Sequence, residues 1–182
     1  MGRDLADPPY TAPQLASLID DVPDFPKKGI LFKDITTLLK DPPAFTQVID
    51  QMTDMLRAHS PRIVIGMESR GFILAAPIAY RLSAGFVPVR KLGKLPGDVV
   101  STEYDLEYGT NTLELHSDAI SPGDRVLVVD DLLATGGTVS ATIDLVERLR
   151  GEVVAVAFLV ELTALRGRDR LQNYEVHSLI RF

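Results

Sequence analysis

The sequence contains no cysteine among its 182 residues, so disulfide bonds and thiolate metal sites are excluded. No hydrophobic run approaches the roughly 18 residues that a membrane-spanning helix needs, and the amino terminus has no hydrophobic signal segment. The formal net charge of -6 argues against a non-specific nucleic-acid binder, which needs a basic surface. We therefore expect a cytoplasmic protein that binds neither a membrane nor a nucleic acid.

Two common nucleotide-binding motifs are also absent, because neither G-x-x-x-x-G-K-[ST] nor G-x-G-x-x-G occurs. The hydrophobic content of 46% suits a single domain over residues 1–182 with a sizeable core. Aliphatic runs alternate with patterns of helical period. Strands are expected at 62–66, 86–90, 125–129, 153–161 and 175–181, and helices at 12–22, from Asp41 to Leu56, and at 70–83 and 139–150. This alternation predicts an α/β fold with a Rossmann-like parallel sheet flanked by helices.

One segment interrupts the alternation. Residues 91–116 are polar and glycine-containing, and Leu113 and Leu115 alternate with polar residues, which is typical of a hairpin. An insertion of this length between two core strands suggests a functional lid.

The most informative stretch follows the predicted strand at 125–129. Two acids, Asp130 and Asp131, are followed by a small turn and then by a helical pattern, and the turn consists of Ala134, Thr135, Gly136, Gly137 and Thr138. In an open parallel sheet, ligands bind beyond the carboxyl ends of the strands. Backbone N–H groups of such a turn, together with the helix start, can bind a phosphate.

Two carboxylates beside a phosphate loop would repel the phosphate itself. They suit the vicinal hydroxyls of a sugar or a divalent cation, so a phosphorylated ribose fits the whole stretch. A purely structural strand-to-helix turn remains the alternative for T-G-G-T taken alone.

The stretch V-V-D-D-L-L-A-T-G-G-T resembles the signature of the type I phosphoribosyltransferases. Further blocks resemble the adenine-specific branch of that family and stand in its order: D-F-P at 24–26, F-K-D-I at 32–35, E-S-R-G-F at 68–72, R-K-L-G-K-L-P-G at 90–97, L-E-Y-G at 106–109 and V-E-L-T at 160–163. The resemblance implies the type I fold, with a small N-terminal hood at about 11–40 and a flexible loop or arm at about 93–116.

The implied reaction is one of purine salvage. Adenine and phosphoribosyl pyrophosphate give AMP and pyrophosphate, with Mg²⁺ required and with inversion at C1 of the ribose. The resemblance also implies that Asp130 and Asp131 lie at the ribose and assist the metal ion, mostly through the substrate. Ser69, Arg70 and Lys91 are then expected to hold the pyrophosphate, while Arg90 has a structural role.

The resemblance assigns two residues of the arm, Glu107 and Tyr108, to the reaction centre together with Arg70. Glu107 is a candidate for handling the proton of the adenine ring. The hood segment containing Leu31 and Lys33 is expected to read the base edge, largely through backbone atoms. Many relatives have arginine at the position of Lys33, which leaves the role of that side chain open.

Leu132 and Leu162 are expected to pack against the faces of the adenine, with an ordinary core position as the alternative for each. A homodimer is implied by the family. Two other functions stay open: transfer to another base such as xanthine or orotate, and a regulator that senses phosphoribosyl pyrophosphate without catalysis. Only about 23 residues precede the D-F-P block, too few for the DNA-binding module of such regulators.

Two further sets of residues have no assigned chemistry. His59, His116 and His177 are far apart in the sequence without metal-ligand spacing, so we interpret them as structural or surface residues. The arginines at 166, 168 and 170 are interpreted as a solvated face or a dimer contact.

Overall fold

A computed structural model of the chain describes residues 10–105 and 110–182. The chain divides into two compact units, Met1–Gln51 and Met52–Phe182. The first unit contains α1 (Ala12–Ser17), β1 (Asp20–Pro23), β2 (Leu31–Asp34), α2 (Thr36–Leu39) and most of α3 (Pro42–Leu56). The second contains η1 (Arg57–His59), β3 (Ile63–Met67), α4 (Arg70–Leu82), β4 (Gly85–Lys91), β5 (Val99–Asp105), β6 (Thr110–His116), β7 (Arg125–Leu133), α5 (Gly137–Arg148), β8 (Glu152–Glu161), η2 (Thr163–Leu165), η3 (Gly167–Arg170) and β9 (Val176–Arg181). The single domain with a hood stays a prediction.

The first unit contains an antiparallel hairpin of β1 and β2, in which Asp20 pairs with Asp34 and Pro23 with Leu31. The helix predicted for residues 12–22 was too long, because pairing with β2 takes over from the local helical pattern after Ser17. The hairpin loop is held by Asp24, whose carboxylate accepts a hydrogen bond of 2.6 Å from the Gly29 N–H. At the start of α3, the Asp41 carboxylate accepts a hydrogen bond from the Ala44 N–H and so caps the helix that the sequence predicts from Asp41.

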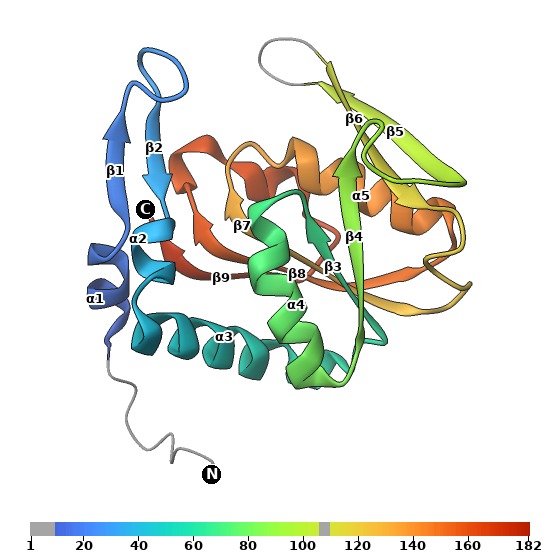
Figure 1. The fold of residues 1–182 in the computed structure, drawn as a ribbon, viewed down its shortest axis with the longest axis horizontal. Coiled ribbons are helices and arrows are strands. Elements are labelled where there is room, and N and C mark those ends of the chain that lie inside the picture. Colours follow the sequence, from blue (N-terminus) through green and yellow to red (C-terminus); the bar gives the residue numbers. More distant parts are fainter. Residues whose placement is uncertain (1–9, 106–109) are drawn as a thin grey trace. The chain divides into compact units, whose positions relative to one another are not determined.

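The second unit is built on a seven-stranded sheet with the order β5-β6-β4-β3-β7-β8-β9 (Figure 1). The five strands from β4 to β9 in that order are parallel, and β6 and β5 continue the sheet in antiparallel fashion. These five strands coincide with the five that hydrophobic runs predict. Within the described ranges, no helix is both long enough and apolar enough to cross a membrane.

Helices α4 and α5 cover opposite faces of this sheet (Figure 1). On one face, the close neighbours of Gly66 in β3 are Ala75 and Gly71 of α4. On the other face, Ile65 of β3 belongs to a buried cluster that includes Val146 of α5. Successive residues of a strand point to opposite faces, so a fully buried strand such as β3 needs apolar residues throughout.

The predicted hairpin arm is confirmed by β5 and β6, which pair from Val99 with His116 to Asp105 with Thr110. The base of the arm is bound to α5, because the Thr102 hydroxyl donates a 2.8 Å hydrogen bond to Asp144. Arg148 of α5 also donates a 3.0 Å hydrogen bond to the Ser101 carbonyl. The flexibility expected of the arm stays a prediction.

Strand β7 is longer than its aliphatic run indicates. The run ends at Val129, but pairing with β8 continues through Asp130 with Phe158 and on to Leu133 with Glu161. The two acids therefore belong to the strand itself, and the loop begins only at Ala134. Strand pairing fixes the backbone at both acids before any ligand binds.

The close packing of β3 against α4 predicts that alanine is tolerated less well at Gly66 than at Gly85. A Cβ on Gly66 would lie 2.8 Å from Ala75 Cβ and 2.9 Å from Phe86 Cε2. We expect Gly66→Ala to lower the free energy of unfolding by about 1–3 kcal/mol, as overpacking of a dense core does. The measurement is urea denaturation. Gly85→Ala is the control, because its nearest neighbour would be 3.7 Å away. Equal stability of the two variants would contradict this account of the packing.

Candidate active site

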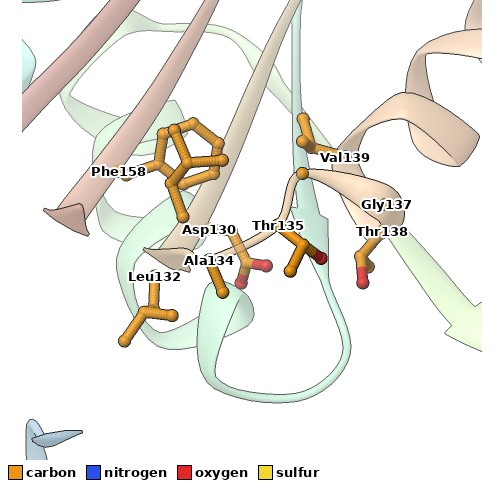
Figure 2. Close-up of a pocket in the computed structure, with 10 residues that line it drawn as sticks. Asp130, Leu132, Ala134, Thr135, Gly137, Thr138, Val139 and Phe158 are labelled. Atoms are coloured by element: carbon orange, nitrogen blue, oxygen red, sulfur yellow. The ribbon is translucent and has the colours of Figure 1, made fainter. Parts of the chain in front are cut away.

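A pocket opens at the carboxyl end of β7, where the sequence predicts the phosphate site (Figure 2). Its volume of ≈ 70 Å³ suits one small group rather than a whole nucleotide. It is lined by Asp130, Leu132, Leu133, Ala134, Thr135, Gly136, Gly137, Thr138, Val139 and Phe158. The structure thus brings together all five predicted loop residues and one of the two acids.

The backbone of the loop is fixed by two glycines. Gly136 has φ +83°, and a Cβ there would lie 2.7 Å from the Gly167 carbonyl oxygen. Gly167 in turn leaves no room for a Cβ against the Ala134 carbonyl. Helix α5 starts at Gly137, so the last two residues of the loop form its first turn, and the unpaired N–H groups of that turn lie at the pocket. This arrangement suits an anion.

The two acids differ in their surroundings. Asp131 is buried and accepts a 2.5 Å hydrogen bond at Oδ2 from Nε of Arg70, the first residue of α4. Asp130 Oδ1 accepts a 2.9 Å hydrogen bond from the Asp131 N–H. Burial raises the pKa of Asp130 well above its ordinary value, and the Asp131 carboxylate adds to the rise.

The ion pair joins two segments that are 61 residues apart. Gly71 permits this approach, since a Cβ there would lie 2.7 Å from Asp130 Oδ1 and 3.1 Å from the Val129 carbonyl. Asp131, which is predicted to bind the ribose, is therefore in direct contact with Arg70, which is predicted to bind the pyrophosphate.

The predicted pyrophosphate residues lie at the ends of β3 and β4. Ser69 is exposed, Arg70 follows it, and Lys91 is exposed at the last position of β4. The Glu68–Ser69 peptide bond is cis. Since β3 and β4 are parallel neighbours, their carboxyl ends bring the two segments to the same edge.

Glu68 fixes this edge, although sequence analysis assigned it no role. Its carboxylate accepts a 3.0 Å hydrogen bond from the Lys91 N–H and pairs with Arg90 at 3.2 Å. Burial alone would raise the pKa of Glu68, but the Lys91 hydrogen bond and Arg90 bring it below its ordinary value. Arg90 is thereby engaged in a structural ion pair, as predicted. The sequence could have indicated this pair, because an acid and a base stand at the carboxyl ends of two strands that are predicted to be parallel.

The predicted adenine residues of the second unit, Leu132 and Leu162, are both half-buried at the ends of β7 and β8. The Leu162 N–H donates a 2.9 Å hydrogen bond to the Leu133 carbonyl, so the two strand ends stay together. Leu31 and Lys33 belong to β2 of the first unit. Leu31 is 50% exposed, whereas the Lys33 ammonium lies 2.5 Å from Asp21 across the hairpin.

Glu161 and Arg168 form a structural ion pair beside Leu162. Arg168 Nε donates a 2.7 Å hydrogen bond to the buried Glu161 carboxylate, and its Nη1 donates to the Val176 carbonyl at 2.9 Å. The interpretation as a solvated face was therefore wrong for Arg168, whereas Arg166 and Arg170 are exposed. The alternative of a dimer contact stays a prediction. Burial alone would raise the pKa of Glu161, but hydrogen bonds from Arg168 and Ser178 bring it below its ordinary value.

The predicted catalytic residues Glu107 and Tyr108 lie outside the described residues. Near the end of β5 in the same arm, the Tyr104 hydroxyl accepts a 3.4 Å hydrogen bond from the Thr138 hydroxyl. Tyr104 is thus a neighbour of the phosphate loop that sequence analysis did not single out.

Comparison with known proteins places this geometry in a family. Residues 35–181 match the family described as the phosphoribosyl transferase domain. The matched residues include the seven-stranded sheet and the pocket after β7. The chain belongs to the phosphoribosyltransferases.

More specific relatives define the branch. An adenine phosphoribosyltransferase of Alkaliphilus metalliredigens is 58% identical over 168 residues, which cover 92% of this chain and 99% of that protein. The crystal structure of the Thermoanaerobacter pseudethanolicus adenine phosphoribosyltransferase matches with TM-score 0.92 and 52% identity, covering 94% of this chain and all of that one. That of Saccharomyces cerevisiae, solved with an imino-altritol bisphosphate and adenine, matches with TM-score 0.88 and 38% identity, covering 93% and 98% of the two chains.

The chain therefore belongs to the adenine phosphoribosyltransferases, enzymes of purine salvage that form AMP. The predicted fold, family and acceptor base are confirmed. The alternatives of another base and of a non-catalytic regulator find no support among these relatives.

The Glu161 ion pair predicts a pH dependence of stability. A carboxyl group whose folded pKa is lowered stabilises the fold above its unfolded pKa, about 4.3 for Glu, and loses this contribution as the pH falls through the folded pKa. We expect Glu161→Gln to be less stable than the wild type at pH 7, with the difference narrowing below about pH 4.3. Urea denaturation at roughly unit intervals across about pH 3–7 measures the difference in the free energy of unfolding between the two proteins.

Glu152→Gln provides the control, because its side chain on the same strand is 62% exposed and its ion pair with Arg125 is long, at 3.4 Å. A stability difference for Glu161→Gln that stays constant over the pH range would contradict the assigned cause.

Proposed function

We propose that phosphoribosyl pyrophosphate binds along the carboxyl edge of β3, β4 and β7. The 5-phosphate binds the loop from Ala134 to Thr138, through its backbone N–H groups and the hydroxyls of Thr135 and Thr138. Asp130 and Asp131 accept hydrogen bonds from the ribose hydroxyls. The pyrophosphate binds Ser69, Arg70 and Lys91. The contact that supports this assignment is the Arg70–Asp131 ion pair, because it holds the two predicted halves of the donor site together.

Each group then has a defined part in the reaction. A nitrogen of adenine attacks C1 of the ribose while the bond from C1 to the pyrophosphate oxygen breaks, with inversion. Positive charge develops on the ribose ring and is stabilised by the nearby carboxylates. Negative charge leaves on the pyrophosphate and is stabilised by the Arg70 guanidinium and the Lys91 ammonium. The rigid strand ends keep the two reactants in line.

The residues present fit a Mg²⁺ ion held mainly through the substrate. Mg²⁺ is commonly bound by one or two carboxylates together with substrate phosphates. Of the two acids, Asp131 is hydrogen-bonded to Arg70 and Asp130 to the backbone of Asp131, so no dedicated all-protein cage is formed here. When bound, the ion neutralises phosphate charge and orients the donor.

Adenine binds against Leu132 and Leu162, whose half-buried side chains offer an apolar surface at the strand ends. The S. cerevisiae relative was solved with adenine and a bisphosphate analogue together, which supports a joint site for base and donor. That Leu31 and the backbone of Lys33 read the base edge stays a prediction from the family resemblance. The Lys33 ammonium pairs with Asp21 within the hairpin. It does not offer the planar set of hydrogen-bond donors that an arginine guanidinium would.

Glu107 handles the proton that the adenine ring gives up, and Tyr108 accompanies it on the arm. The arm excludes water, which protects the reactive sugar from hydrolysis. A homodimer and a cytoplasmic location remain predictions from the family resemblance. Light scattering on the purified protein tests whether it is a homodimer.

The Asp131 assignment predicts a selective loss of donor binding. We expect Asp131→Asn to raise KM for phosphoribosyl pyrophosphate at least about 10-fold and to lower kcat, because a buried partner of Arg70 is lost. KM for adenine should change little. The measurement is initial-rate kinetics of AMP formation with each substrate varied.

Asp124→Asn is the matched control, because Asp124 pairs with Arg62 Nε at 2.9 Å at the opposite end of the sheet. A selective rise of the adenine KM in Asp131→Asn, or equal effects of both variants, would overturn the assignment of Asp131.

The Glu107 assignment predicts a loss in the chemical step. We expect Glu107→Ala to lower kcat by about 10²–10⁴-fold while the affinity for phosphoribosyl pyrophosphate is mostly kept, as for loss of a general acid–base group. Glu103→Ala on exposed β5 is the control and should keep kcat. Single-turnover kinetics with donor-binding titration measures both quantities. An unchanged kcat in Glu107→Ala removes Glu107 from this role.

A further inference from the structure

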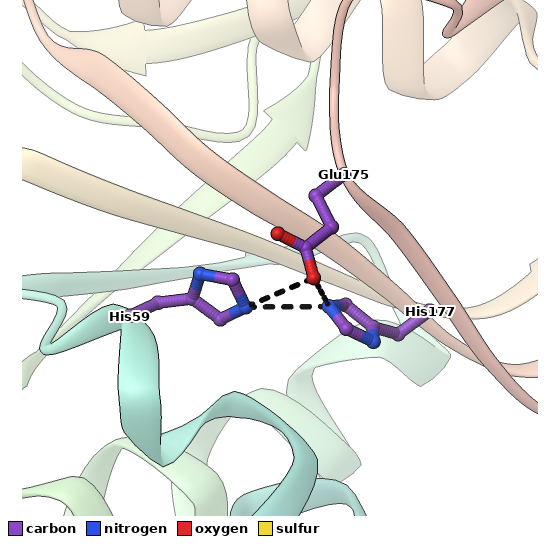
Figure 3. Close-up of side chains that lie close together, drawn as sticks. All are labelled: His59, Glu175 and His177. Atoms are coloured by element: carbon purple, nitrogen blue, oxygen red, sulfur yellow. Dashed lines mark hydrogen bonds and ion pairs between the residues drawn. The ribbon is translucent and has the colours of Figure 1, made fainter.

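Two histidines and a glutamate converge near the start of the edge strand β9, apart from the candidate active site (Figure 3). His59 is the last residue of η1, Glu175 immediately precedes β9, and His177 is its second residue. His59 and His177 are 118 positions apart, which is why their spacing in the sequence did not indicate a site. All three belong to the second unit.

The three side chains point their ligand atoms at one another. The Nε2 atoms of His59 and His177 are 3.3 Å apart. Glu175 Oε1 lies 3.1 Å from His177 Nε2 and 3.7 Å from His59 Nε2. A tetrahedral metal ion with bonds of about 2.0–2.1 Å separates its ligand atoms by roughly 3.3–3.4 Å. The triangle therefore has the dimensions of one face of such a tetrahedron.

The protonation chemistry of the group also suits a cation. Each neutral imidazole has one N–H donor and one acceptor nitrogen, so with the proton on Nδ1 both Nε2 atoms can bind one cation together with the Glu175 carboxylate. With a proton on Nε2, the same atoms form hydrogen bonds with one another instead.

The backbone around each ligand is held in place. Arg125 donates hydrogen bonds of 3.1 and 2.8 Å to the His59 carbonyl. The Glu175 carbonyl accepts a 2.9 Å hydrogen bond from the Val156 N–H of β8. Side chains of His59 and His177 are 15% and 21% exposed, whereas Glu175 is 60% exposed. The group is thus fixed on one side and open to solvent on the other, where an ion and a water ligand can enter.

We infer that His59, Glu175 and His177 bind a divalent transition-metal ion of the Zn²⁺ type. Two imidazoles and one carboxylate are a ligand set typical of Zn²⁺. Mg²⁺ prefers oxygen ligands, so the ion at this site is different from the one that accompanies the substrate. The bound ion joins η1 to β9 and stabilises the second unit, because it binds the folded state in preference to the unfolded one.

The inference is tested on the full-length protein after chelator treatment and dialysis. We expect calorimetric titration with Zn²⁺ alone to show one equivalent bound per chain and Zn²⁺ to raise Tm. Co²⁺ should give the visible d–d absorption of a tetrahedral site, and Mg²⁺ should give neither effect. Each of His59→Asn and His177→Asn should weaken Zn²⁺ binding at least about 10-fold.

His116→Asn provides the matched control, since His116 lies on β6 outside the group and its loss should leave Zn²⁺ binding unchanged. All three variants should keep transferase activity with Mg²⁺, which also reports that they fold. Histidine-ring NMR of the wild type needs no variant: Zn²⁺ should shift the ring signals of His59 and His177 and leave those of His116. Absence of Zn²⁺ binding, or equal binding by the wild type and both site variants, overturns the inference.

Discussion

The ion pair between Arg70 and Asp131 is the contact on which the proposed donor site depends. It joins the first residue of α4 to the end of β7, and Gly71 lets the helix approach closely enough for the pair to form. Burial and the neighbouring Asp131 carboxylate raise the pKa of Asp130 beside it, because this edge of the sheet is partly dehydrated. Electrostatic groups in such surroundings act more strongly on a reacting substrate than they would in water.

Two other carboxylates have a structural task at the same edge. Glu68 orients the backbone of Lys91, and Glu161 forms an ion pair with Arg168. Their lowered pKa values reflect these partners rather than contact with a ligand. The acids at the carboxyl edge therefore divide into those that support the site and those proposed to face the sugar, and only the second kind belongs to the family signature.

Much of the fold was predictable because hydrophobic period and strand–helix alternation are local signals. The loop after Asp131 was predictable because glycines and threonines at a strand end have a specific physical use. The end of the first helix was not, because pairing across the β1–β2 hairpin overrides local propensity. The meeting of His59 with His177 was also missed, because the two residues are 118 positions apart. The role of Arg168 was missed because the short 3-10 turns between Glu161 and Arg168, which bring the two together, have no clear sequence pattern.

The central claim is that the loop from Ala134 to Thr138 binds the 5-phosphate while the acids before it face the ribose. A crystal structure of the protein with AMP bound tests this most directly. We expect the phosphate oxygens within about 2.7–3.2 Å of the loop nitrogen atoms, and the ribose hydroxyls at similar distances from the carboxylates of Asp130 and Asp131. A phosphate bound elsewhere, or a ribose turned away from both acids, would contradict it.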